Sequence, residues 1–178
     1  SATHVIIPTH WDESIDGNFL QNAKSKAVKI HRLDGLHGHV HLRPGIHANK
    51  VSNPPKVLVR LLKGDGIHDG NELVDVPIGT FDGLDVTYAN EDQYGGDAWL
   101  LDRELAKHDG VITQSVTLAS EAVLLGTPAL LISKAQRGFL SRLQDDGYPL
   151  FHWQQPCEGD EWRNMFCLLY TSPSPRDT

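Results

Sequence analysis

The chain of 178 residues is 39% hydrophobic and 22% charged, a composition typical of a folded globular protein. It carries 16 Lys and Arg against 23 Asp and Glu, so its formal net charge at pH 7 is -7. An acidic chain without a block of Lys or Arg argues against nucleic acid as the main partner, because cationic side chains are what neutralise the phosphate backbone.

The longest weakly charged stretch, residues 111–133, contains Glu121 as its only charge and is interrupted by Gly126. A membrane-spanning helix needs about 20 predominantly apolar residues, so we expect a buried strand, helix and strand here and no transmembrane segment. Of the two cysteines, Cys167 falls in the terminal segment discussed below, and an unpaired Cys157 fits a reducing compartment. We therefore expect a cytoplasmic protein, or one that is peripheral to the membrane.

The first half of the chain predicts short strands. Strand-like runs lie at 5–8, 28–30, 40–42, 56–62 and 85–89, and the fourth of these is the strongest. The sequence Asn53-Pro54-Pro55 predicts a turn or linker. We expect a domain boundary between about Arg43 and Pro55, so that residues 1–45 and 46–166 belong to different domains. The segment 64–96 shows no helix ahead of its strand.

The second half alternates between helix and strand. The expected order is helix 98–107, strand 110–113, a helix capped by Ser115 or Thr117 and ending at Gly126, strand 129–132, helix 136–146 and strand 148–153. Consecutive helix–strand units with short connections imply parallel strands. The sequence therefore predicts an α/β protein with a doubly wound, Rossmann-like parallel sheet.

Polar residues stand where one predicted strand ends and a helix begins. Gln114 and Ser115 follow the strand 110–113, and ligands of such sheets bind outside the carboxyl ends of the strands. A helix N-terminus attracts an anion such as a diphosphate, and the hydroxyls of Ser115 and Thr117 add donors. The alternative is that these hydroxyls are ordinary helix caps.

Glu121 lies one helical turn after Thr117 and is the one charge in an apolar helix. A buried carboxylate is costly unless it is hydrogen-bonded, and a ribose diol would supply two donors. The alternative is an acid near a helix start that is favoured by the dipole and faces water.

The pattern Ser115-x-Thr117-x-x-x-Glu121-Ala122-x-x-Leu125-Gly126-Thr127-Pro128 resembles the nucleotide-sugar site of GT-B fold glycosyltransferases. It is similar, more closely, to an archaeal and bacterial family of glycosyltransferase-like proteins of unknown function. That family also has an Asp-Gly passage ending in Leu-x-Pro at its domain junction, then a strand with an Arg, then His-Asp. Residues 34–44, Arg60 and His68-Asp69 fit these features, and the resemblance spans about residues 5–153.

The resemblance implies that residues 46–166 are the C-terminal, donor-binding half of a glycosyltransferase and that residues 1–45 are the remnant of the N-terminal acceptor domain with its linker. The donor substrate would be a nucleotide-diphosphate sugar, with no separate cofactor, and the acceptor a glycan or a lipid-linked sugar. In the donor site, Gln114, Ser115 and Thr117 would hold the diphosphate and Glu121 the ribose.

Lys134, Gln136 and Arg137 follow the next strand, so they also face the cleft, where a cation would neutralise phosphate. The alternative is that they are solvated residues at a helix start. The catalytic base is left unassigned, with His68 and Asp69 as candidates.

Three other functions stay open. A nucleotide-sugar 2-epimerase shares the fold, and a binding module without catalysis would share the donor site. A metal-dependent hydrolase would use His37, His39 and His41, which alternate on the expected strand, with His47 or with His68 and Asp69. Because no second spaced motif accompanies these histidines, we expect no metal site.

The last residues, 167–178, read Cys-Leu-Leu-Tyr-Thr-Ser-Pro-Ser-Pro-Arg-Asp-Thr. Up to Asp177 they match the translation of the transposase adapter used in tagmentation sequencing libraries. We therefore expect this segment to be an artefact without regular structure, on a fragment of environmental origin. The natural protein would then continue past Phe166 and begin before Ser1, with the fold truncated at both ends and the fragment inactive alone.

Overall fold

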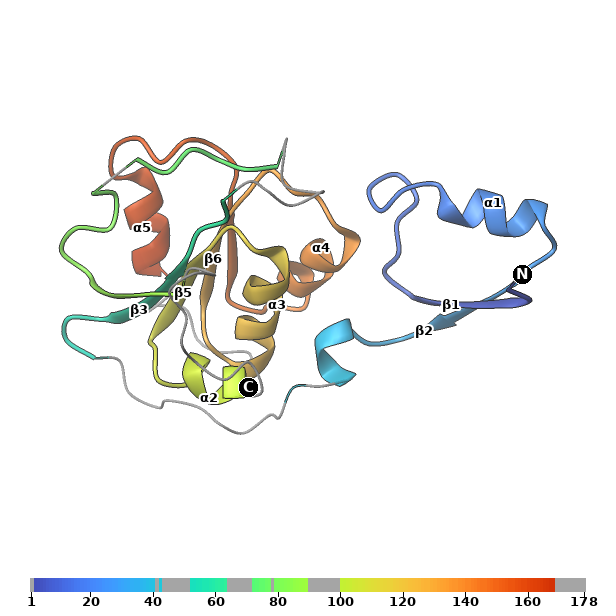
Figure 1. Ribbon diagram of the computed structural model, residues 1–178, viewed down its shortest axis with the longest axis horizontal. Helices are drawn as coiled ribbons and strands as arrows, with labels where there is room; N and C mark the ends of the chain where they lie inside the picture. The colour runs from blue at the N-terminus through green and yellow to red at the C-terminus, as the bar shows by residue number, and fades with distance from the viewer. Residues whose placement is uncertain are drawn as a thin grey trace.

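The computed structural model describes residues 2–40, 42, 52–63, 72–77, 79–89 and 100–168, which form two separate parallel sheets (Figure 1). The first 33 residues give β1 (His4–Pro8), α1 (Phe19–Ser25) and β2 (Lys29–Leu33), and β1 pairs with β2. We call residues 4–33 the N-terminal unit. A 3-10 helix, η1 (His37–Val40), follows it.

The larger sheet has five strands in the order β4-β3-β5-β6-β7, and every neighbouring pair is parallel. Its strands are β3 (Lys56–Arg60), β4 (Asp85–Tyr88), β5 (Gly110–Thr113), β6 (Ala129–Ile132) and β7 (Leu150–Trp153). The chain moves from β3 outward to β4, then crosses back to β5 and continues outward on the other side. The predicted α/β, Rossmann-like doubly wound fold is confirmed, and its topological switch point lies between β3 and β5.

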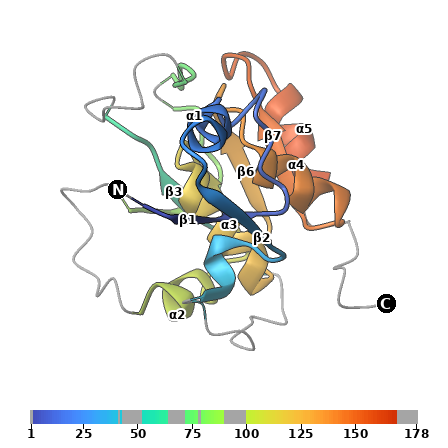
Figure 2. The same cartoon turned by 90° about the vertical axis from the view of Figure 1, so that its right-hand side faces the viewer.

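Helices cover both faces of this sheet. They are α2 (Leu101–Leu105), α3 (Val116–Leu125), α4 (Gly138–Asp145) and α5 (Glu161–Leu168). On one face, Val111 and Leu131 pack with residues of α2, α3 and α4, and on the other, Ile112 and Leu130 pack with α5. This alternation follows from the period of two along a strand. The N-terminal unit lies on the side of α3 and α4, away from α5 (Figures 1 and 2).

The elements that carry the clearest sequence patterns form as expected. Each residue of β5 and β6 is buried, as continuous apolar strands in a covered parallel sheet should be. The helix α3 begins after Ser115, whose hydroxyl accepts a hydrogen bond from the backbone N–H of Leu118 (3.4 Å). It ends at Gly126 in the left-handed conformation (φ 94°), which glycine adopts without steric cost.

The strand expected at 40–42 is wrong at its start, because Val40 ends the 3-10 helix η1. Gly35 turns the chain there with φ +124°, and the next residues fold against α3. Gly38 approaches α3 so closely that a Cβ would lie 2.5 Å from Leu124 Cδ1. The chain therefore coils at a point of close contact instead of extending.

Several expectations fall outside the described residues. These are the lack of structure at 171–178, most of the boundary at 43–55 and the start of the helix at 98–107. The helix α5 includes Cys167, which is exposed, and Leu168, so it extends into the segment assigned to the adapter. Within the described ranges, no helix is both long and apolar enough to cross a membrane.

Candidate functional site

The carboxyl ends of β3 and β5 are tied together at the switch point. Thr113 donates its hydroxyl hydrogen bond to the Arg60 carbonyl (2.9 Å) and accepts one from the backbone N–H of Ser115 (3.0 Å). The buried side chain of Gln114 accepts from the N–H of Leu62 (3.0 Å) and donates to the carbonyl of Val74 (2.7 Å). The side chain of Gln114 therefore braces the edge of the sheet, and any contact of this residue with a ligand stays a prediction.

A cavity of about 690 Å³, which we call the interface cavity, lies between the N-terminal unit and the helices α3 and α4. A second hollow of about 260 Å³, the strand-end pocket, lies at the switch point between Leu62 and Ser115. Thr117, Arg137 and Phe139 line both. The strand-end pocket and the interface cavity are therefore neighbours that share part of their lining.

Glu121 and Thr117 lie on the wall that α3 gives to the interface cavity. Glu121 is only 8% exposed, whereas Thr117, one turn earlier, is exposed at the junction of the two hollows. The sequence spacing that placed these residues on one helical face is thus reproduced in three dimensions. Glu121 does not lie on a solvent-facing side of the helix.

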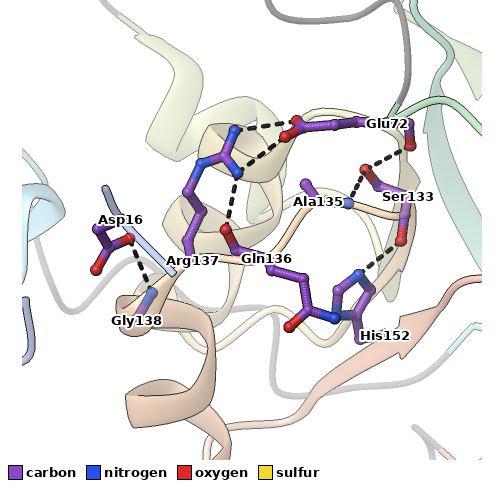
Figure 3. Close-up of polar contacts among 8 residues, drawn as sticks. All are labelled: Asp16, Glu72, Ser133, Ala135, Gln136, Arg137, Gly138 and His152. Carbon is purple, nitrogen blue, oxygen red and sulfur yellow. Dashed lines mark hydrogen bonds and ion pairs between the residues drawn. The ribbon is translucent and has the colours of Figure 1, made fainter. Parts of the chain in front are cut away.

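Arg137 is engaged by a carboxylate that the sequence did not indicate (Figure 3). Its two terminal nitrogens, Nη1 and Nη2, bind Glu72 at 2.9 and 3.0 Å, and Nη1 also donates to the carbonyl of Gln136 (2.8 Å). The Glu72 carbonyl accepts from the N–H of Lys134 (2.7 Å) and the hydroxyl of Ser133 (3.1 Å). Lys134 itself is exposed. The loop after β6 is therefore held by Glu72, and Arg137, the partly buried cation of this loop, is paired with the Glu72 carboxylate.

The N-terminal unit is joined to α4 through Asp16. One carboxylate oxygen of Asp16 accepts from the N–H of Gly138 (3.1 Å), the first residue of α4, and the other accepts from the N–H of Asp12 (3.0 Å). A Cβ at Gly138 would collide with the backbone oxygen of His10 and lie 2.6 Å from the Asp16 carboxylate. The unit and the helix can meet in this way only because residue 138 is a glycine.

His10 is a partly buried residue of the cavity wall that sequence reasoning missed. Its ring packs edge-on against Phe139, with 6.3 Å between ring centroids. Burial lowers the pKa of His10, and the negative charge of Asp16 partly offsets this. His10 stands just beyond the end of β1, so the rule that strand ends carry ligand-binding residues would have found it had it been applied to the first strand.

The other histidines do not build a metal centre in the described part of the chain, where no group of three His, Cys, Asp or Glu could hold an ion. His37 and His39 lie on the turn of η1 and not on an extended strand, so the expected alternation on one face is wrong for this pair. His41, His47, His68 and Asp69 fall outside the described residues, and the last two therefore stay untested as catalytic candidates.

The structure is therefore that of a Rossmann-like doubly wound α/β protein with a cavity of ligand size between the N-terminal unit and the helices α3 and α4. No protein-family model, curated protein or solved structure matches the chain.

Proposed function

We propose that the chain binds a nucleoside-diphosphate sugar in the interface cavity, as the donor-binding half of a glycosyltransferase. The observation that carries the proposal is the alignment of Thr117 and Glu121 along one wall of the interface cavity, with Thr117 also lining the strand-end pocket at the switch point. The volume of about 690 Å³ is within the range of about 300–1,000 Å³ typical of small-molecule sites.

The chemistry of the lining supports one orientation of the donor. The N-terminus of α3, the Thr117 hydroxyl and the Arg137 guanidinium suit the diphosphate. One turn along α3, the Glu121 carboxylate suits the two ribose hydroxyls as a double acceptor. The indole ring of Trp11 with Leu36 and Leu124 offers apolar surface to the base.

His10 is our candidate for the base in the transfer step. Its lowered pKa favours the neutral imidazole near neutral pH, which is the form that accepts a proton. In the step, His10 takes the acceptor hydroxyl proton and the acceptor oxygen bonds to the anomeric carbon. The bond from that carbon to the diphosphate breaks, and its electron pair leaves with the diphosphate. Arg137 and the N-terminus of α3 stabilise the charge that develops there.

We propose a cytoplasmic location, with either a glycan or a lipid-linked sugar as acceptor. Cys157 is a buried free thiol, which fits a reducing compartment.

Calorimetric titration of uridine diphosphate into the 178-residue chain tests the donor site. A hydrogen bond to a charged group contributes about 1.5–3 kcal/mol, so Glu121→Ala should weaken binding by roughly ten- to a hundredfold. Glu121→Gln keeps one acceptor and should lose less. Glu161→Gln, an exposed acid at the start of α5, is the matched control and should change nothing.

A second variant tests the role of Arg137. Glu72→Gln removes the carboxylate that competes with phosphate for the guanidinium and should tighten binding of uridine diphosphate.

Unchanged affinity in Glu121→Ala, with the fold intact by circular dichroism, would leave Glu121 as a helix-dipole acid and remove the main support for the donor site.

A further inference from the structure

A third hollow, of about 270 Å³, lies between the segment that follows β2 and the helix α4. We call it the polar pocket. Its lining includes Asp34 and His39 on one side and Arg142 and Tyr148 on the other. His10 and Leu36 line both the polar pocket and the interface cavity, so the two hollows are neighbours.

The polar pocket offers donors and acceptors without a surplus of positive charge. Asp34 is oriented through Oδ1, which accepts from the Thr9 hydroxyl (3.2 Å) and the N–H of Gly35 (3.1 Å). Arg142 is paired with Asp146 at 2.6 Å. This set of two carboxylates, one guanidinium and one phenol is suited to hydroxyl groups, which both donate and accept, and poorly suited to a phosphate.

We infer that the polar pocket receives the acceptor of the transfer, and that the group it takes is one neutral sugar ring. This inference rests on the proposed function, because His10 lines both hollows and would lie beside the acceptor hydroxyl where that hydroxyl meets the donor. The volume admits about one sugar ring and excludes a second nucleotide, which needs the larger space typical of small-molecule sites. The Asp34 carboxylate accepts from ring hydroxyls, and Arg142 and Tyr148 donate to ring oxygens.

The test uses three probes, the methyl glycosides of glucose, galactose and mannose, each titrated into the ¹⁵N-labelled 178-residue chain. We expect amide shifts at Asp34, His39 and Tyr148, and none at 117–121. Uridine diphosphate should shift 117–121 and leave Asp34, His39 and Tyr148 unchanged, because these three residues line the polar pocket and not the interface cavity. Asp34→Ala should weaken the glycoside by about tenfold or more, because it removes a charged acceptor.

Because Asp34 also orders its own turn, a second variant is needed. Tyr148→Phe keeps the ring, which packs against the core, and removes only the hydroxyl. It should weaken the glycoside by about two- to tenfold, the effect of one neutral hydrogen bond. Glu161→Gln should again change nothing.

The outcomes separate this inference from the proposed function. Uridine diphosphate that shifts 117–121, with no glycoside shifting Asp34, His39 or Tyr148, overturns the acceptor site and leaves the donor site in place. Glycoside shifts confined to 117–121 also overturn it. Glycoside shifts at His39 and Tyr148 that depend on Asp34, without nucleotide binding, would support the polar pocket as a sugar site while refuting the donor proposal.

Discussion

The two sheets of this protein are both parallel, yet they differ sharply in burial. Each residue of β5 and β6 is buried. In β1 and β2, all of whose residues the structure describes, only Ile7 is buried. In β1 and β2, Ile6 is 67% and Leu33 59% exposed. Parallel sheets are normally covered on both faces, and local stability follows buried apolar contacts. The candidate site therefore has one wall on a well-packed sheet and one on a weakly packed unit.

This difference matters because the two walls supply different chemistry. The well-packed wall holds Thr117, Glu121 and Arg137, the groups proposed to bind the donor. The weakly packed wall holds His10 and Asp16. Ligand-binding elements that move are commonly drawn from the low-stability part of a protein. We therefore expect the N-terminal unit to open and close over the interface cavity.

The largest effect should come from removing a core side chain of the larger sheet, and the matching change in the smaller sheet should have much less effect. Leu130→Ala, in β6, should lower the free energy of unfolding by about 2–5 kcal/mol, because Leu130 is 0% exposed. Ile7→Ala should lower the global free energy of unfolding by less than about 1 kcal/mol, since the N-terminal unit opens locally before the larger sheet unfolds. Chemical denaturation measures the global free energy of unfolding. Hydrogen exchange over residues 4–33 measures the local opening of the N-terminal unit. Equal global losses in the two variants would mean that both sheets unfold as one unit.

A smaller effect on stability should follow from disrupting the contact between the N-terminal unit and the helix α4. Gly138→Ala places a Cβ against the His10 backbone and the Asp16 carboxylate. Overpacking of this kind costs typically about 1–3 kcal/mol, and here the N-terminal unit should yield because it is the weaker partner. Limited proteolysis should cut residues 9–18 faster, while α3 and α4 stay protected. Ser141→Ala, an exposed change on the same helix, is the control, and identical cleavage of both variants would contradict the proposed docking.

The sequence predicted the well-packed region best, and for a physical reason. The helix α3 has a hydroxyl cap at Ser115, a glycine stop at Gly126 and continuous apolar strands on either side, all of which are local signals. The same signals placed Glu121 on the helical face of Thr117, which the structure shows lining the interface cavity, because a helix fixes the direction of a side chain relative to its neighbours.

No local sequence pattern indicates the contacts that complete the site. Arg137 and Glu72 are 65 residues apart in the chain, and Asp16 and Gly138 are 122 apart. Their pairing depends on the packing of the N-terminal unit and of the segment around Glu72, which no helical or strand period encodes. The strand expected at 40–42 failed because three alternating residues are a weak pattern beside the close approach of Gly38 to Leu124.

The smallest effect should be a loss of stability in mild acid, and it separates the two regions once more. Burial lowers the pKa of His10, in the N-terminal unit, and of His152, in β7, whose Nε2 lies 2.7 Å from the Ser133 carbonyl. A folded-state pKa below the ordinary value means that the folded protein binds fewer protons than the unfolded chain. The stability penalty is therefore absent well above pH 6.5 and grows as the pH falls through 6.5 towards the lowered pKa. The penalty should be modest because both histidines are only partly buried.

Thermal unfolding between pH 8 and pH 5 should show a fall in melting temperature that His152→Gln reduces. Hydrogen exchange over residues 4–33 should show an acid-induced loosening that His10→Gln reduces. The exposed His31→Gln is the control for both. A melting temperature that rises on acidification, or a fall left unchanged by both substitutions, would show that these histidines do not set the response to pH.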